Sequence, residues 1–286
     1  MTTEPHSDPD VYSAFEGDLP GTVTPSALRR RLRRYVPALV LAFLVLVVWE
    51  LVVRVFDIEE FILAKPTEIY STFLDEFDTV VEAGWTTVRE ALLGLALGTV
   101  FGVLAAVATA RWAGLREGLL PFAVAANSIP ILALAPIANQ WFGLTSITAK
   151  AAVVSVIVFF PVMINTVRGL TEVDPGELEL MRAIAAPPRE VVRRVRIPNA
   201  LPYFFSALKV AAALAVIGAI VAEYFGGRTA SLGFYITQQA GAFKFAEAWS
   251  AIIVGSFLGI AIYGSVLLLE RWAMPWHVSL RTADDR

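Results

Sequence analysis

The sequence predicts an all-α protein: a bundle of six transmembrane helices with a polar helix-turn-helix segment between the fourth and fifth. Hydrophobic residues make up 57% of the 286-residue chain, and its mean hydropathy is +0.64. A fold surrounded by water could not bury so much apolar surface. Apolar runs of spanning length recur along the chain, and arginines gather beside alternate runs. Together these observations predict a membrane protein with a fixed orientation.

The chain begins with a polar, acidic segment rich in Ser, Thr, Pro and Gly, which covers residues 1–28. This composition is typical of disorder, because it offers too little apolar surface to pack. We expect residues 1–28 to be a disordered cytoplasmic tail and residues 29–286 to form the membrane domain. The tail does not resemble a signal peptide, because the first apolar run follows it and has full spanning length.

Six apolar runs are candidates for transmembrane helices, since a helix needs about 20 residues to cross the hydrocarbon core. They cover residues 37–56, 88–110, 118–140, 147–168, 202–222 and 248–269. The connection after the first run is acidic and long enough for an amphipathic surface helix at residues 67–77.

Positive charge predicts the orientation of these spans. Arginines lie before the first span, between the second and third, between the fourth and fifth, and after the sixth. The other connections carry few basic residues. Because basic residues stay on the cytoplasmic side, both termini and residues 174–202 are predicted to be cytoplasmic, with the protein in the plasma membrane.

Small residues predict close helix packing in two of the spans. Gly94, Gly98 and Gly102 recur at every fourth position of the second span, and Ala106 continues the series. Gly255 and Gly259 repeat the spacing in the last span. Small side chains let neighbouring helices approach closely, so this pattern indicates a polytopic bundle.

The third span contains prolines and amides, which are unusual at membrane depth. Broken helices are tolerated where they are buried in protein or line a water-filled cavity. We therefore interpret it as a pathway wall, or alternatively as a kinked structural helix. Candidate pathway residues here and near the ends of later spans are Asn127, Ser128, Asn139, Gln140, Asn165 and Glu223. Glu223 could instead lie at the external interface, while Lys209 is expected to extend toward the lipid headgroups.

Residues 174–202 form the polar insert between the fourth and fifth spans. Asp174 is a suitable N-cap and Pro175 suits the first helical position, so a helix should begin there. The Pro187-Pro188 pair should end it.

A second short helix is expected at residues 189–195, ending near Pro198, and Pro202 should begin the next long helix. Apolar residues alternate with arginines in this segment. An amphipathic, basic surface outside the bilayer indicates a docking site. The alternative is that the arginines only set the topology.

Several kinds of chemistry are excluded by the residues available. The chain has no cysteine and only two histidines, His6 and His277, which lie outside the spans, so neither a disulfide nor a His- or Cys-ligated metal centre is expected. It has no phosphate-binding G-x-x-x-x-G-K-[ST] sequence, so it should not bind ATP by that mechanism. No nucleophile-base combination can be assembled. We therefore expect that this chain performs no covalent reaction and has no cofactor of its own.

The polar insert resembles the signature of the binding-protein-dependent transport permease family, the membrane subunits of ATP-binding-cassette importers. That signature is E-A-A, three residues, Gly, nine residues and I-x-L-P. The matching positions here are Glu179, Leu180, Met181, Ala185, Val195, Ile197 and Pro198, with the spacing kept. Leu-Met replaces Ala-Ala, and Ala185 replaces the Gly.

Four further segments resemble the family in order: ILAKPTEIY, SIPILALAPIANQWFG, FFPVMINTVRGL and AEYFGGRTASLGFYI. The permeases most similar in pattern are those for nitrate, sulfonates and taurine, and a group for pyrimidine-type precursors. Trp276-His277-Val278-Ser279 is similar to the ending of that second group.

The resemblance implies a permease domain at residues 29–286, with residues 174–202 as its ATPase-coupling segment. The implied partners are two cytoplasmic ATPases that bind ATP and Mg²⁺, an external solute-binding protein and a second permease copy. The alternative is a secondary transporter or channel that works without ATP. Such proteins usually carry charged sites at the midplane of an internal repeat, and the sequence shows neither.

Overall fold

The computed structural model describes residues 27–126, 131–227 and 230–275. Within these ranges every regular element is a helix, which confirms the predicted all-α class. The chain divides into two compact units at Val52 and Val53. The first unit contains most of α2 (Ala27–Val55), which covers the predicted span 37–56 except for its last residue. The second unit contains all the other helices.

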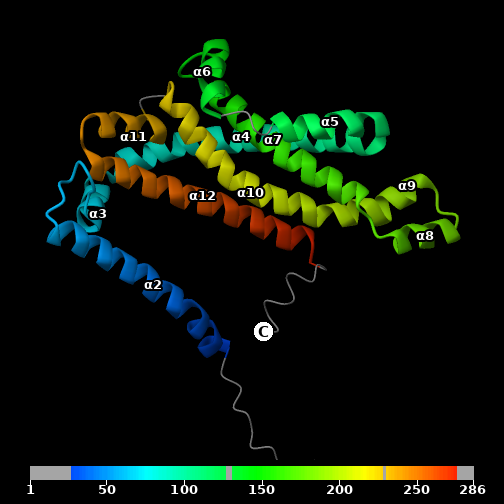
Figure 1. Ribbon diagram of the computed structural model, residues 1–286, viewed down its shortest axis with the longest axis horizontal. Helices are drawn as coiled ribbons and strands as arrows, with labels where there is room; N and C mark the ends of the chain where they lie inside the picture. The colour runs from blue at the N-terminus through cyan, green and yellow to red at the C-terminus, as the bar shows by residue number, and fades with distance from the viewer. Residues whose placement is uncertain (1–26, 127–130, 228–229, 276–286) are drawn as a thin grey trace, which may run out of the picture. The chain divides into compact units, whose positions relative to one another are not determined.

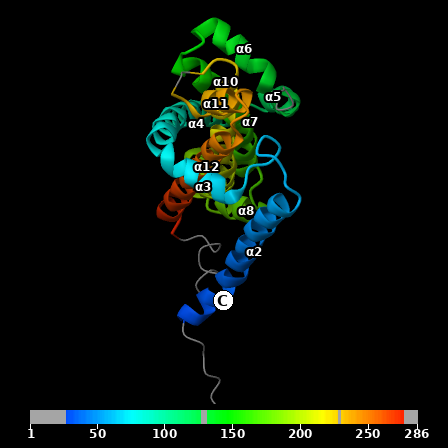
Figure 2. The same cartoon turned by 90° about the vertical axis from the view of Figure 1, so that its left-hand side faces the viewer.

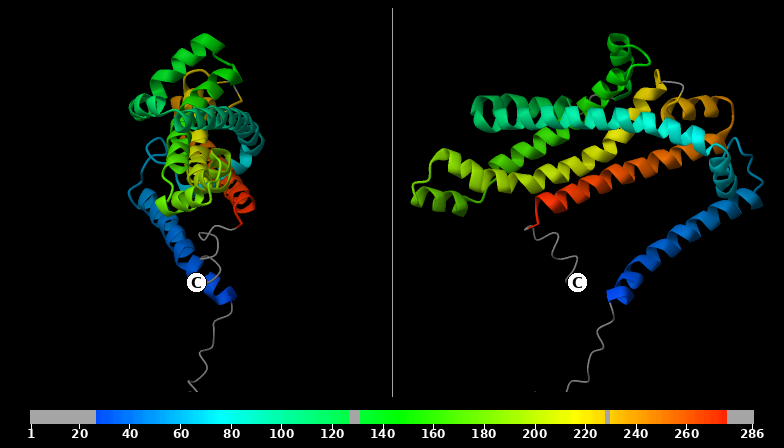
Figure 3. Two further views of the ribbon diagram at one scale, coloured as in Figure 1. Left: turned by 90° about the vertical axis from the view of Figure 1, so that its right-hand side faces the viewer. Right: turned by 180° about the vertical axis from the view of Figure 1, so that it is seen from behind.

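Four long helices form the body of the second unit: α4 (Phe77–Arg111), α7 (Ile147–Thr171), α10 (Ile197–Tyr224) and α12 (Phe245–Ala273). They lie side by side in Figures 1 and 3. Each contains one predicted span and, like α2, is long and apolar enough to cross a membrane, giving five such helices among the described residues. These five predictions are confirmed as apolar helices of spanning length.

The third predicted span, 118–140, covers two shorter helices. These are α5 (Ala113–Ala126) and α6 (Ile131–Phe142), which lie together at the top of Figure 2. Neither reaches the roughly 20 residues that a single crossing needs. The six-span count therefore stays a prediction. Asn127 and Ser128 fall outside the described residues.

The predicted glycine series packs α4 against α7. A Cβ atom added at Gly98 would lie 2.5 Å from the backbone oxygen of Ser155, and one at Gly94 would lie 2.4 Å from Cβ of Val154. Ala106 is fully buried. Because no side chain separates the two backbones, α4 and α7 make the most extensive helix contact in the second unit.

The second small-residue pair behaves differently. A Cβ atom at Gly255 would lie 2.9 Å from Cδ1 of Ile220, whereas one at Gly259 would meet no atom within 4 Å. The packing prediction is therefore wrong for Gly259 within this chain. Gly259 instead lines an apolar groove of about 650 Å³ between α10 and α12.

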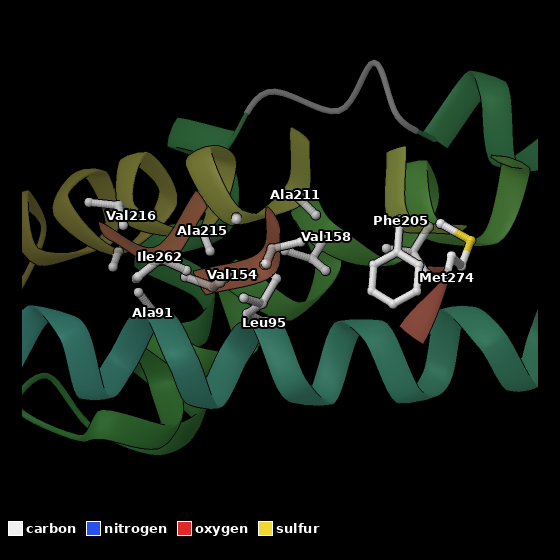
Figure 4. Close-up of a cluster of buried hydrophobic side chains, with 14 residues drawn as sticks. Ala91, Leu95, Val154, Val158, Phe205, Ala211, Ala215, Val216, Ile262 and Met274 are labelled. Carbon is white, nitrogen blue, oxygen red and sulfur yellow. The ribbon is translucent and has the colours of Figure 1, made fainter. Parts of the chain in front are cut away.

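Apolar side chains from all four long helices meet in the interior (Figure 4). Val154 and Val158 of α7 lie between Leu95 of α4 and the small residues Ala211 and Ala215 of α10. Alternation of large and small side chains allows dense packing. This core positions the polar residues described below.

Two short helices accompany the long ones. Helix α3 (Pro66–Asp75) confirms the predicted surface helix at 67–77, and its start is stabilised by an ion pair of 2.7 Å between Lys65 Nζ and Glu68 Oε1. Helix α11 (Leu232–Gly241) was not predicted. It lies between α10 and α12 in sequence, at the end of the bundle near α3 (Figure 1).

At the other end of α10 lie α8 (Pro175–Ala183) and α9 (Pro188–Val191). A π-helical turn, η1 (Val192–Arg196), joins α9 to α10 without a break. The predicted helix end near Pro198 is therefore wrong. The N–H of Ile197 donates to the oxygen of Val192, so the wider π-helical turn comes just before Pro198. Pro198 then occupies the first turn of α10, where its missing N–H costs little.

Candidate functional site

Residues 174–202, called here the docking segment, begin with the predicted cap. Asp174 Oδ1 accepts a hydrogen bond of 2.7 Å from the N–H of Gly176, and Pro175 is the first residue of α8. This cap satisfies one of the N–H groups left free at a helix start. The polar segment therefore starts as a defined helix rather than a loop.

The turn after α8 depends on Ala185. The N–H of Ala186 donates to the oxygen of Met181 at 3.0 Å, and the N–H of Ala185 donates to that of Arg182 at 2.9 Å. These two bonds define a Schellman motif, whose turn residue adopts a left-handed backbone and is usually glycine. Ala185 occupies that position with φ of 51°. This geometry explains why the family signature that the segment resembles has glycine at the position of Ala185.

The seven signature residues separate into two faces. Met181 and Val195 are buried. Glu179, Leu180, Ala185 and Ile197 are exposed, while Pro198 is half-buried. Leu180 is 64% exposed, and the neighbouring Ile184, outside the signature, is 63% exposed. The buried residues pack the segment against the bundle. Leu180 and Ile184 present apolar side chains outward.

Asn199 anchors the docking segment to α7. Its Nδ2 donates to the backbone oxygens of Gly169 at 2.8 Å and Glu172 at 3.0 Å. A Cβ atom at Gly169 would lie 2.6 Å from Cα of Ala200, so the end of α7 touches the start of α10 directly. Neither Asn199 nor Gly169 was predicted from the sequence. The available signal was the position of Asn199 directly after Pro198.

Positive charge surrounds the exposed apolar residues. The arginines of the segment are Arg182, Arg189, Arg193, Arg194 and Arg196, and all are exposed except the half-buried Arg196. Glu190 Oε1 forms an ion pair with one of them, at 2.8 Å from Arg194 Nε. Such a basic rim around apolar side chains favours a partner surface with acidic groups.

A second polar site lies deep in the bundle. Thr87 and Glu90 of α4, Lys150 of α7 and Glu223 of α10 are all 0% exposed. We call these four residues the ionic cluster. Charged groups are costly to bury unless they are paired and hydrogen-bonded, so their positions need partners.

Glu223 connects three helices. Its Oε1 accepts a hydrogen bond of 2.8 Å from the Thr87 hydroxyl, and its Oε2 accepts one of 2.6 Å from the N–H of Gly233 in α11. The Thr87 oxygen in turn accepts the N–H of Leu232 at 3.1 Å. Glu90 lies beside Glu223 in the same buried site.

Lys150 supplies the positive charge. Its Nζ donates to Asn139 Oδ1 of α6 at 3.0 Å and to the backbone oxygen of Leu144, and both acidic residues act on it electrostatically. Asn139 Nδ2 donates to the oxygen of Phe225 at 3.0 Å. Lys150 therefore connects α7 to α6 and, through Asn139, to the residue that follows α10.

The cluster shows that charged residues are buried between the long helices. Neither Glu223 nor Asn139 is exposed in this chain. Gln140 is exposed, while half-buried Asn165 donates to the oxygen of Pro161 on its own helix, away from the cluster. Glu90 and Lys150 were not selected because each looks like a lone charge near the end of an apolar run.

Lys209 also differs from expectation. Its Nζ lies 3.0 Å and 2.8 Å from the two carboxylate oxygens of Glu270 in α12. The prediction that it extends to the lipid headgroups is therefore wrong. The two side chains are 61 residues apart in sequence, so no local pattern could have paired them.

The sequence matches known transport proteins over most of its length. It is 31% identical to the formylaminopyrimidine transport permease protein ThiX of Halalkalibacterium halodurans, an alignment covering 82% of this chain and 92% of that one. It is 25% identical to the putative aliphatic sulfonates transport permease protein SsuC of Bacillus subtilis, over 92% and 96% of the two chains.

The fold is similar to that of a solved methionine transporter. The MetNI methionine ABC transporter superposes with a TM-score of 0.59 at 20% identity, covering 69% of this chain and 97% of that one. Residues 98–275 match the family described as binding-protein-dependent transport system inner membrane component. This chain belongs to that family, the permease subunits of ABC transporters.

Proposed function

We propose that two copies of this chain form the solute pathway of an ATP-driven importer in the plasma membrane. Each docking segment contacts a cytoplasmic ATPase, and a binding protein delivers solute from outside. The observation that carries this proposal is the docking segment, with Leu180 and Ile184 exposed inside a basic rim. Exposed apolar patches with a polar border are typical of protein interfaces.

The anchoring of this segment suits it to transmit force. Asn199 and Gly169 fix it to α7, and η1 continues it into α10. A partner that displaces α8 and α9 must therefore also move the long helices. ATP and Mg²⁺ bind to the partner, because the chain has no phosphate-binding loop.

We infer that the solute is a small polar molecule of the aminopyrimidine or aliphatic sulfonate class. The named activities of the relatives support these two classes. The aminopyrimidine class has the higher-identity relative of the two and is the first to test. Gln140 is exposed on α6 and remains a candidate for lining the pathway.

The test is ATP hydrolysis in proteoliposomes that contain this chain, its ATPase and its binding protein. Hydrolysis should rise when binding protein loaded with an aminopyrimidine, or with a sulfonate, is added. Glu179→Lys should abolish that rise, because it reverses a charge on the exposed face of α8.

The matched control is Glu117→Lys, which makes the same charge change at an exposed position of α5, outside the docking segment. It should leave the stimulation intact. If the chain binds no ATPase, the proposal is wrong and an ATP-independent transporter becomes the better account.

A further inference from the structure

The docking segment and the ionic cluster lie at opposite ends of one continuous helical run. This run extends from Pro188 to Tyr224, which is 37 residues, and Figures 1 and 3 show α9 and α11 at its two ends. At 1.5 Å per residue, it is about 55 Å long. A helix of this kind can carry a displacement from one end to the other.

At the far end, the ionic cluster joins α10 to four other helices. Glu223, the second-last residue of α10, binds α4 through Thr87 and binds α11 through the N–H of Gly233. Lys150 of α7 donates to Asn139 of α6, and Asn139 Nδ2 in turn donates to the oxygen of Phe225, which follows α10.

Such a cluster resists gradual deformation. Fully buried polar groups in a low dielectric cannot exchange one partner for water, so losing one contact leaves an uncompensated charge. Removing one member of a buried charged pair is strongly destabilising. The connected helix ends therefore favour a single arrangement and move together.

We propose that Glu223 and Lys150 are positioning residues of the transport cycle. They hold the far ends of α4, α6, α7, α10 and α11 as one rigid block, so that a displacement of the docking segment shifts the whole block. This inference rests on the proposed function. It predicts that breaking the cluster uncouples the solute side from ATP hydrolysis.

The first test compares stimulated with basal ATP hydrolysis in the complete complex. Glu223→Gln leaves one acceptor oxygen for two donors, the Thr87 hydroxyl and the N–H of Gly233, and removes the charge opposite Lys150. The ratio of stimulated to basal hydrolysis should fall about five-fold or more, which lies within the usual range of coupling between sites. Glu82→Gln, on the exposed face of α4, is the matched control and should keep the ratio.

A triple variant separates positioning from simple stability. Glu90→Gln and Glu223→Gln combined with Lys150→Met remove both carboxyl groups and the cation beside them. Melting temperature should recover relative to Lys150→Met alone, while the hydrolysis ratio should stay low. Recovery of both quantities would overturn the proposal, because stability alone would then explain the loss of coupling.

A measurement on the otherwise unaltered protein covers the case in which the cluster variants fail to fold. The chain has no cysteine, so spin labels can be placed at exposed Trp85 of α4 and Gln238 of α11 through introduced cysteines. Their separation should stay constant between the ATP-bound and ADP-bound complexes. A shift of several ångströms would refute the rigid block.

These outcomes are distinct from failure of the proposed function. If the unaltered chain shows no ATPase association, the proposed function is wrong. If the unaltered chain is coupled and Glu223→Gln is coupled equally well, only the positioning role is wrong.

Discussion

At the scale of single residues, Ala185 shows how a substitution can be explained by backbone geometry. The docking segment needs a left-handed residue at this position to complete the Schellman hydrogen bonds. A Cβ atom makes that conformation unfavourable by roughly 1–2 kcal/mol. The turn is therefore formed with backbone strain at Ala185.

Ala185→Gly should stabilise the turn. Relief of the strain outweighs the extra chain entropy of glycine, which is about 0.5–1 kcal/mol, and leaves a net gain of about 0.5–1 kcal/mol. Hydrogen exchange of α8 and the turn should slow by about two- to five-fold. Ala185→Val should have the opposite effect, and equal exchange in all three proteins would contradict the strain.

The Lys209 and Glu270 pair should respond unequally to single and double substitutions. Lys209→Met strands a nearly buried carboxylate, which we expect to cost about 2–3 kcal/mol, less than a fully buried pair because Lys209 is partly exposed. Lys209→Met with Glu270→Met should recover most of this loss. Thermal unfolding in detergent tests the cycle, and additive losses would show that the two residues do not interact.

At the scale of elements, glycine position decides how closely two helices pack. Gly98 meets the α7 backbone, whereas Gly259 of α12 faces open groove. Both belong to small-residue series that look alike in sequence. The same pattern therefore has two outcomes, because the one-dimensional spacing does not say which helix, if any, stands opposite.

Gly98→Ala and Gly259→Ala form a matched pair of substitutions. The first places a Cβ atom 2.5 Å from the oxygen of Ser155, so α4 and α7 must separate. The free energy of unfolding should fall by about 1–3 kcal/mol. The second should leave it within about 0.5 kcal/mol. Thermal unfolding of the two variants tests the close contact. Equal losses of unfolding free energy in both would contradict it.

Local signals in the sequence were sufficient for the long helices and for the start of α8. Apolar runs gave the spans, and Asp174 with Pro175 gave the cap. The ionic cluster was beyond local reasoning, because Glu90, Lys150 and Glu223 meet only after three helices pack. The predicted helix end near Pro198 was wrong for a different reason. The π-helical turn before Pro198 removes the steric and hydrogen-bonding conflict by which a proline normally ends a helix.

At the scale of the whole molecule, the number of crossings determines where the ends of the chain lie. Five crossings would place the termini on opposite sides, whereas the arginine distribution predicts one side for both. The difference depends on α5 and α6, which must together make one crossing if the arginines are right.

Single cysteines on either side of α5 and α6 should therefore react from opposite faces. Gly114 lies in open space in the first turn of α5, and Thr145 is exposed just after the end of α6, so each can be replaced by cysteine. In intact cells, a membrane-impermeant thiol reagent should label the second and not the first. Labelling of both, or of neither, would show that α5 and α6 do not cross.

The ionic cluster also constrains the order in which the protein can be built. Glu90 is synthesised first, Lys150 second and Glu223 last, so α7 meets the bilayer before its final partner exists. Only Glu90, already present in α4, can then offset the charge of Lys150. If α4 and α7 pair early along their glycine contact, α7 can leave the translocation channel for lipid with Lys150 already next to a carboxylate. Helix α10 then adds Glu223 and completes the charge balance.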